Sequence, residues 1–227
     1  MAEQQQAVAA LAAEVNAITA AVTGAAEQDF TRPTRCHGWT VKDLLLHLLR
    51  DAYWALVVFA TPTQAPADVD FVSYWRTFDP ADTAQHEANE RATRLAASAY
   101  RTGAGLAAEW QEAAAAALRV AAAALPGTRV ATQGHVLEVD DFIVTLVAEV
   151  TIHGLDMAPG LGRAGWASEE GLALTHATVV GLLGREVPAE LGWDKVRLVL
   201  KLTGRAPLTD GERAMLGTIQ DRLPVLG

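Results

Sequence analysis

The chain has 227 residues, which suits one large domain or one domain with a small appendage. Its formal net charge is −9 at pH 7 and no basic patch is visible, so a nucleic-acid partner is not expected. Hydrophobic residues make up 51% of the chain and aromatic residues only 6%; a core of Ala, Leu and Val is expected, which favours packed helices over sheets.

The N-terminal stretch MAEQQQAVAALAAEV carries an acid and no basic residue, so it is not expected to be a signal peptide. No uninterrupted apolar run approaches the ~20 residues that a membrane-spanning helix needs. Cys36 is the single cysteine, and a chain without an internal disulfide suits a reducing cytoplasm. Together these features predict a soluble, cytoplasmic protein with no membrane partner.

The first half of the chain is predicted to be helical with two interruptions. Residues 3–29 place apolar side chains at helical spacing. After FTRPTRCHGW, Thr40 and Asp43 approximate a capping box, which starts a second helix that continues to about residue 60. The proline-rich segment 61–82 is predicted to be a long loop that could cover a pocket.

Residues 82–125 again predict helix, with a possible break at Gly103. TRVATQGHVLEV alternates weakly around Gly134 and indicates a small hairpin. Further helices are expected over 140–158, 168–183 and 193–203, with a last short helix opened by Thr209 and Glu212.

The predicted fold is therefore mainly all-α, an up-and-down four-helix bundle. We expect residues 1–165 to form the bundle and residues 166–227 to form a short, mostly helical C-terminal extension packed on it.

Glu149, His153 and Asp156 are the most informative polar residues of the chain. In a strand, Glu149 and His153 would lie ~13 Å apart and could not share an ion. In a helix they are i and i+4, on one face with ~6 Å of rise, and Asp156 follows on the same face. An unpaired buried carboxylate is costly, and a cation held by Glu149 and His153 would compensate it.

His47, inside the run LLLHLL, is the natural third ligand, because bundle sites draw ligands from facing helices. Asp43 and Asp51 lie one turn on either side of it, and Asp43 could orient the imidazole. Structural interpretations compete: a histidine among leucines is more often a core residue bonded to a neighbour, and a Glu-x-x-x-His pair more often a surface ion pair. Spacing alone leaves the two interpretations about even.

The other histidines fit a metal site less well. Cys36 and His37 are adjacent, and adjacent residues rarely converge on one reacting atom. His86 is expected on a solvated face, His135 in the hairpin, and His176 in a structural role.

PTRCHGWTVKDLLLHLL and, some hundred residues later, EVTIHGLDMA resemble the mycothiol-dependent maleylpyruvate isomerase family, which shares the metal-binding bundle of the DinB-like superfamily. The resemblance covers about the first 160 residues. It implies a four-helix bundle and a divalent metal, usually Zn²⁺ with Ni²⁺ as the alternative, held by His47, Glu149 and His153. It also implies mycothiol, the low-molecular-weight thiol of actinobacteria, as cosubstrate.

The C-terminal part follows this family less closely. Its isomerases carry a C-terminal α/β domain, whereas the residues after Trp166 look mostly helical here, and KLTGRAPLTDGER resembles a Leu-Thr-Gly-Arg stretch of shorter relatives. Arg205 could reach substrate carboxylates, although an exposed charge near a helix end is the favoured interpretation. Asp43, Asp156 and Arg205 are the candidates for supporting or substrate-contacting roles.

The resemblance predicts an enzyme that adds or transfers the mycothiol thiolate to an electrophilic small molecule, as an isomerase or an S-transferase. The alternatives are a thiol-independent metal-dependent hydrolase and a non-catalytic DinB-like metal-binding protein. The expected partners are the electrophile and mycothiol, and the chain is expected to be a monomer or a homodimer.

Overall fold

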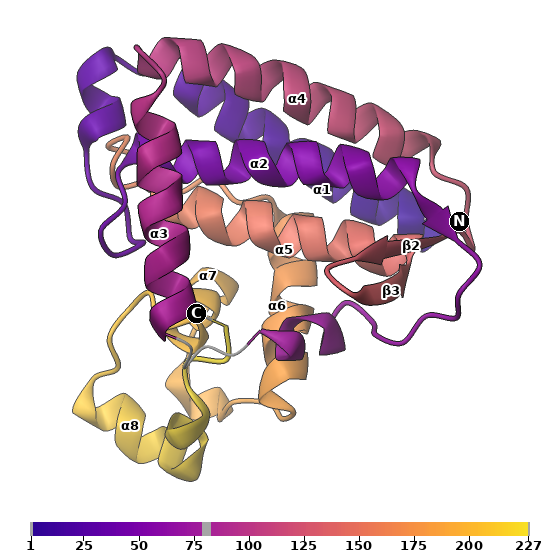
Figure 1. Cartoon of the computed structure of the whole chain (residues 1–227). Helices are drawn as coiled ribbons and strands as arrows, with labels where there is room; N and C mark the ends of the chain where they lie inside the picture. Colours follow the sequence, from indigo (N-terminus) through magenta and orange to yellow (C-terminus); the bar gives the residue numbers. More distant parts are fainter. Residues whose placement is uncertain (1, 79–82, 227) are drawn as a thin grey trace.

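The computed structural model describes residues 2–78 and 83–226. Four long helices form a bundle, with α1 and α2 each packed against both α4 and α5 (Figure 1). The mainly α-helical bundle predicted from the sequence is confirmed. Its helices are α1 (Ala2–Thr23), α2 (Val41–Ala60), α4 (Gly103–Ala123) and α5 (Val139–Met157).

The helical stretch predicted over 82–125 consists of a shorter helix, α3 (Thr83–Ser98), and α4, which are separated at the predicted break. Thr102 caps α4, and a Cβ on Gly103 would lie 2.1 Å from the ring of Phe30, so only glycine fits this contact. Figure 1 shows α3 crossing the bundle at the end where α2 and α4 begin; α2 and α4 run in the same direction, whereas α2 and α5 run antiparallel. The up-and-down order predicted from the sequence therefore does not extend to α2 and α4.

The ends of the first two helices follow from local hydrogen bonds. The capping box of α2 forms as predicted, with Thr40 and Asp43 bonded reciprocally. α1 ends at Thr23, earlier than predicted, because the carboxylate of Asp29 accepts the backbone N–H of Ala26 and closes a separate 3₁₀ turn.

The stretch Glu3–Thr23 is long and apolar enough to cross a membrane by length and composition, although no uninterrupted run of that length was apparent. In this structure the same stretch lies within α1, whose apolar side chains pack against α4, α5 and α6. α1 is therefore a bundle helix here.

The predicted hairpin is confirmed as β2 (Arg129–Thr132) and β3 (His135–Glu138), paired antiparallel. Gln133 and Gly134 at its turn both have positive φ, 49° and 85°, as tight hairpins require. β1 (Pro62–Thr63) adds a third strand beside β2.

The segment predicted as loop 61–82 is only partly irregular. Besides β1 it contains the 3₁₀ helix η2 (Ser73–Thr77), and residues 79–82 lie outside the described part.

The C-terminal part is helical and has its own apolar core, which also includes Ile152 and Leu155 of α5. α6 packs against both α5 and α1. The final residues fold back onto the end of α7, where the N–H of Val225 bonds to the carbonyl of Leu202. The elements are α6 (Glu169–Leu183), η3 (Ala189–Leu191), α7 (Lys195–Leu202), α8 (Asp210–Leu216) and η4 (Gly217–Arg222). The division at 165/166 stays a prediction.

Candidate metal centre

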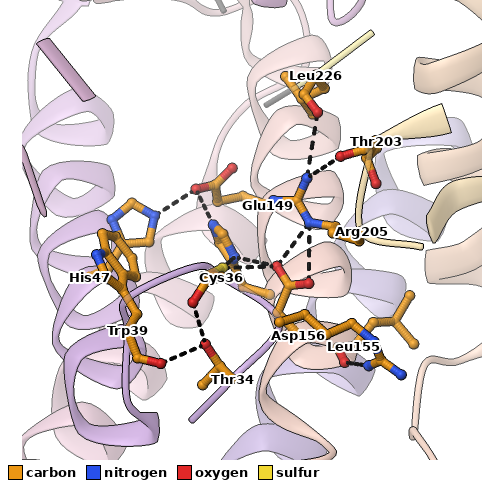
Figure 2. Close-up of polar contacts among 12 residues, drawn as sticks. Thr34, Cys36, Trp39, His47, Glu149, Leu155, Asp156, Thr203, Arg205 and Leu226 are labelled. Atoms are coloured by element: carbon orange, nitrogen blue, oxygen red, sulfur yellow. Dashed lines mark hydrogen bonds and ion pairs between the residues drawn. The ribbon is translucent and has the colours of Figure 1, made fainter. Parts of the chain in front are cut away.

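His47 of α2 and two residues of α5 converge on one point. Nε2 of His47 lies 2.9 Å, and Nε2 of His153 3.2 Å, from the same oxygen, Oε1 of Glu149. The two imidazole rings stand nearly perpendicular, with centroids 4.9 Å apart. Figure 2 shows His47 and Glu149 pointing toward each other across the bundle. The helical spacing in α5 thus places one carboxylate and two imidazoles where a single divalent ion could bind.

The leucines around His47 are buried and exclude water from one side of this group. Leu44, Leu45 and Leu46 are at most 4% exposed, as are Leu48 and Leu49, whereas the side chain of His47 is 27% exposed. The edge of the Trp39 ring packs against the imidazole, with centroids 5.2 Å apart. The imidazole is therefore fixed on one side and open on the other.

The carboxylate of Glu149 and the imidazole of His153 strongly affect each other's pKa. Burial acts to raise the pKa of Glu149, but the neighbouring His153 and His47 outweigh it and hold that pKa well below its ordinary value. Burial likewise acts to lower the pKa of His153, and Glu149 and Asp156 raise it well above its ordinary value. The protonated imidazole of His153 thus supplies the positive charge that a metal ion would otherwise supply, and metal binding would release this proton.

Asp51 adds a second carboxylate to the group. Its Oδ2 lies 3.3 Å from Nε2 of His47 and is buried without a hydrogen-bond partner in the described part of the chain. Burial raises the pKa of Asp51 to about 6, which His47 only partly offsets. An orphaned acid beside two imidazoles and Glu149 is the donor set that a divalent cation satisfies, so the residues present fit a metal ion.

A second possible ligand group shares His153. Sγ of Cys36 donates to Oδ2 of Asp156 at 3.2 Å and lies 3.7 Å from Nδ1 of His153. Nε of Arg205 also donates to both oxygens of Asp156, at 2.9 and 3.1 Å. A permanent guanidinium charge already compensates this carboxylate, so a metal ion fits better at the Nε2 side of His153, with His47 and Glu149.

In this arrangement Asp156 orients the candidate ligand His153. Its Oδ2 lies 3.1 Å from Nδ1 of His153, which fixes the ring with Nε2 toward Glu149. Burial opposes the charge, and hydrogen bonds from His153 and Arg205 nevertheless lower the pKa of Asp156. Arg205, favoured as an exposed charge from the sequence, is only 11% exposed, since the returning tail covers it and its Nη1 donates to the carbonyls of Thr203 and Leu226 (Figure 2).

Asp43 has a different environment. Its Oδ2 accepts from the backbone N–H and the hydroxyl of Thr40, at 2.9 and 2.7 Å, which caps α2. Among the described contacts none joins Asp43 to His47. Its expected orienting role stays a prediction with no contact behind it, and Asp51, one turn later, holds the corresponding place.

The ligand group opens onto a cavity of about 820 Å³ between the bundle and the segments that cover it. α2 and α5 form its floor, and the remaining walls come from the loop before α2, η2, α3, the hairpin turn and the C-terminal tail. Leu226 and Arg205 therefore line the same cavity as His47.

The chain matches the family model described as the mycothiol maleylpyruvate isomerase N-terminal domain, over residues 11–158. The chain belongs to this family. No curated protein and no solved structure gave a match. The matched range contains His47, Glu149 and His153 and ends one residue after α5, whereas the C-terminal residues that complete the cavity lie beyond it. Membership of the mycothiol maleylpyruvate isomerase family points to a mycothiol-associated, metal-dependent enzyme.

Sequence reasoning gave no role to two neighbours of the candidate ligand group. It places Asp51 one turn from His47, and their i, i+4 spacing puts both on one face of the helix. Cys36 reaches His153 only because the loop before α2 folds onto the end of α5, where the N–H of Arg35 bonds to the carbonyl of Asp156. No local sequence signal indicates that contact.

Proposed function

We propose that this protein is a metal-dependent enzyme that uses mycothiol as cosubstrate and adds or transfers its thiolate to an electrophilic small molecule. The observation that carries the proposal is the convergence of His47, Glu149 and His153 at the floor of a cavity. Zn²⁺ is the proposed metal, with Ni²⁺ as the alternative. We place the enzyme in the cytoplasm, as a monomer or a homodimer.

Two imidazoles and one carboxylate are the ligand set of many catalytic zinc sites. When bound, a divalent cation acidifies a coordinated thiol and so supplies a thiolate at neutral pH. The protein's residues keep one face of the site open to the cavity and the other dry, since His47 is partly exposed while its leucine neighbours are buried. Asp156, which is itself held by Arg205, fixes the orientation of the His153 ring.

The reaction requires only bond changes between thiolate and acceptor. The sulfur lone pair forms a C–S bond at an electron-poor alkene carbon, and the π pair moves onto the acceptor's electron-withdrawing group. Rotation about the resulting single bond and expulsion of the thiolate give the geometric isomer. Protonation of the adduct, which balances the proton lost by the thiol, instead gives an S-conjugate, and displacement of a leaving group, which departs with its bonding pair, gives one directly.

Two assays with the zinc-loaded chain test this proposal. One follows isomerisation of maleylpyruvate, the compound in the family's name, and the other follows mycothiol conjugation to monochlorobimane by mass spectrometry. We expect thiol-dependent turnover in at least one assay, lost in His47→Ala and retained in His135→Ala, whose imidazole pairs with Asp68 outside the cavity. Turnover of ester substrates without thiol would favour the hydrolase instead, and a zinc-loaded chain inert in every assay would favour a non-catalytic metal-binding protein.

A further inference from the structure

Aromatic side chains gather at one end of the cavity. The chain has six Trp, three Tyr and five Phe, and six of these rings line this single cavity. A sequence so poor in aromatic residues has concentrated them around the proposed site. Five of the six, at the end nearest the hairpin, form what we call the aromatic wall: Trp54, Tyr74, Trp75, Phe78 and Phe142.

The helices explain why these rings share one end. Trp54 follows His47 by seven residues, and Phe142 precedes Glu149 by seven, so each ring lies on the face of its helix that carries a proposed ligand. Seven residues advance a helix by about 10 Å. Because α2 and α5 are antiparallel, both rings are displaced toward the hairpin, and the wall continues the metal-binding floor in one direction (Figure 1).

The polar ends of the wall are tied to the hairpin. Nε1 of Trp54 donates to the hydroxyl of Thr132 at 2.8 Å, and the hydroxyl of Tyr74 accepts from Nε2 of Gln133 at 3.1 Å. A tryptophan and a tyrosine whose polar atoms are already bonded offer a ligand their apolar ring surface. The hairpin therefore orients the wall.

The η2 rings brace one another. The centroid of Tyr74 lies 5.4 Å from that of Trp75 and 5.3 Å from that of Phe78, in edge-to-face contacts. Even so, Phe78 remains 38% exposed and Trp54 47% exposed. Large aromatic rings held in place yet left exposed beside a cavity are typical of small-molecule sites.

The opposite end of the cavity offers little to a small dianion. The guanidinium of Arg205 is engaged by Asp156, and that of Arg35 donates to the carbonyl of Leu155. Arg50, which is exposed, is the remaining arginine that lines the cavity among the described residues, and the acids Asp51 and Glu149 line the same cavity. The strongest feature available for recognition is therefore the aromatic wall.

We propose that the aromatic wall is the acceptor subsite and that the acceptor is a planar, apolar electrophile, with an aromatic or conjugated ring system stacked on Trp54 and the η2 rings. The reactive carbon then lies toward His47 and Glu149. That the bound molecule accepts a thiolate rests on the proposed function, but the binding of a planar apolar molecule at the aromatic wall can be measured without turnover.

The test titrates the purified full chain with N-phenyl-1-naphthylamine, a neutral planar fluorophore whose emission rises in apolar sites. We expect saturable binding, a Kd at least about tenfold higher in Trp54→Ala, and substantial recovery in Trp54→Phe, which keeps a flat ring. The matched control is Tyr53→Ala, which removes the neighbouring aromatic residue, 45% exposed and outside the cavity lining, and should leave the Kd within about twofold.

Competition identifies the ligand class. Neutral 1-naphthol should displace the fluorophore, and maleate should not. Equal Kd values in wild type and Trp54→Ala, or displacement by maleate in preference to 1-naphthol, would overturn the inference. If Trp54→Ala loses fluorophore binding but no assay detects thiol chemistry, the proposed function is refuted and the aromatic subsite stands. If mycothiol conjugation occurs and is unaffected by Trp54→Ala, the proposed function stands and the aromatic subsite is refuted.

Discussion

Two carboxylates in this protein, Glu212 and Glu149, have opposite surroundings. Glu212, in the C-terminal extension, accepts from Nζ of Lys201 at 2.7 Å, from Nη2 of Arg197 at 2.8 Å and from Nε1 of Trp193 at 2.9 Å. The backbone N–H of Thr209 adds a further bond at 2.8 Å. Every neighbour is a donor, and two of them carry permanent charge.

The ion pairs of Glu149 among the described residues are with His47 and His153, two groups that can lose their charge. His47 and His153 direct ring nitrogens at it, Asp51 adds a second acid beside His47, and no Lys or Arg contacts it in the part of the chain that the structure describes. A carboxylate surrounded by donors stabilises a fold, whereas acids and imidazoles whose lone pairs converge are stabilised by a cation from outside. Substitutions at the first carboxylate should therefore change folding stability, and substitutions at the second should change metal binding.

The largest effect is expected at Glu212. Glu212→Ala leaves the ammonium of Lys201 buried without a carboxylate to neutralise it, so Tm should fall by about 10 °C or more in thermal unfolding. Zinc content of the folded protein should not change. A wild-type Tm in this variant would contradict the claim that Glu212 stabilises the fold.

Loss of a proposed ligand should act on the metal instead. His47→Ala, Glu149→Gln and His153→Ala should each weaken zinc binding by about 10²–10³-fold, measured by competition with a chromophoric chelator. His135→Ala is the control, because that imidazole pairs with Asp68 at 3.1 Å away from the site. Equal zinc affinity in His47→Ala and His135→Ala would be incompatible with the assignment.

A smaller effect is expected when the orientation of His153 is disturbed. Asp156→Asn keeps the size of the side chain but weakens its hold on Nδ1, so zinc affinity should fall by about 10–100-fold. Because Asp156 also neutralises Arg205, Tm should fall as well. Changes in Tm without any change in zinc affinity would reduce Asp156 to a purely structural residue.

The smallest effect is a pH dependence of the metal-free protein. Burial raises the pKa of Asp51 from 3.8 to about 6, so between these values the folded chain holds a proton that the unfolded chain has released. Asp51 should therefore reduce stability as pH rises from about 4 to 6. The difference in Tm between Asp51→Asn and wild type should grow over that window, and saturating zinc should diminish it; a constant difference would contradict the raised pKa.

Local sequence patterns predicted the floor of the site. The capping residues Thr40 and Asp43 located the start of α2, and the spacing of Glu149 and His153 assigned them to one face of α5. Both signals act within one helix, where spacing along the chain determines position in space.

Contacts between distant segments could not be predicted in this way. Arg205 is buried because Leu226 returns over it, and Tyr74 reaches the cavity because η2 packs near the hairpin. These placements depend on the tertiary path of the chain. Local spacing therefore located the candidate ligands on their helices, whereas the cavity around them depends on the tertiary structure.

The most direct test of the central claim is zinc K-edge X-ray absorption of the zinc-loaded chain without added thiol. Binding by His47, Glu149 and His153 predicts only nitrogen and oxygen neighbours at about 2.0–2.2 Å, with imidazole scattering that weakens in His47→Ala. A zinc–sulfur distance near 2.3 Å that disappears in Cys36→Ser would place the ion at Cys36, His153 and Asp156 instead, and would contradict the account.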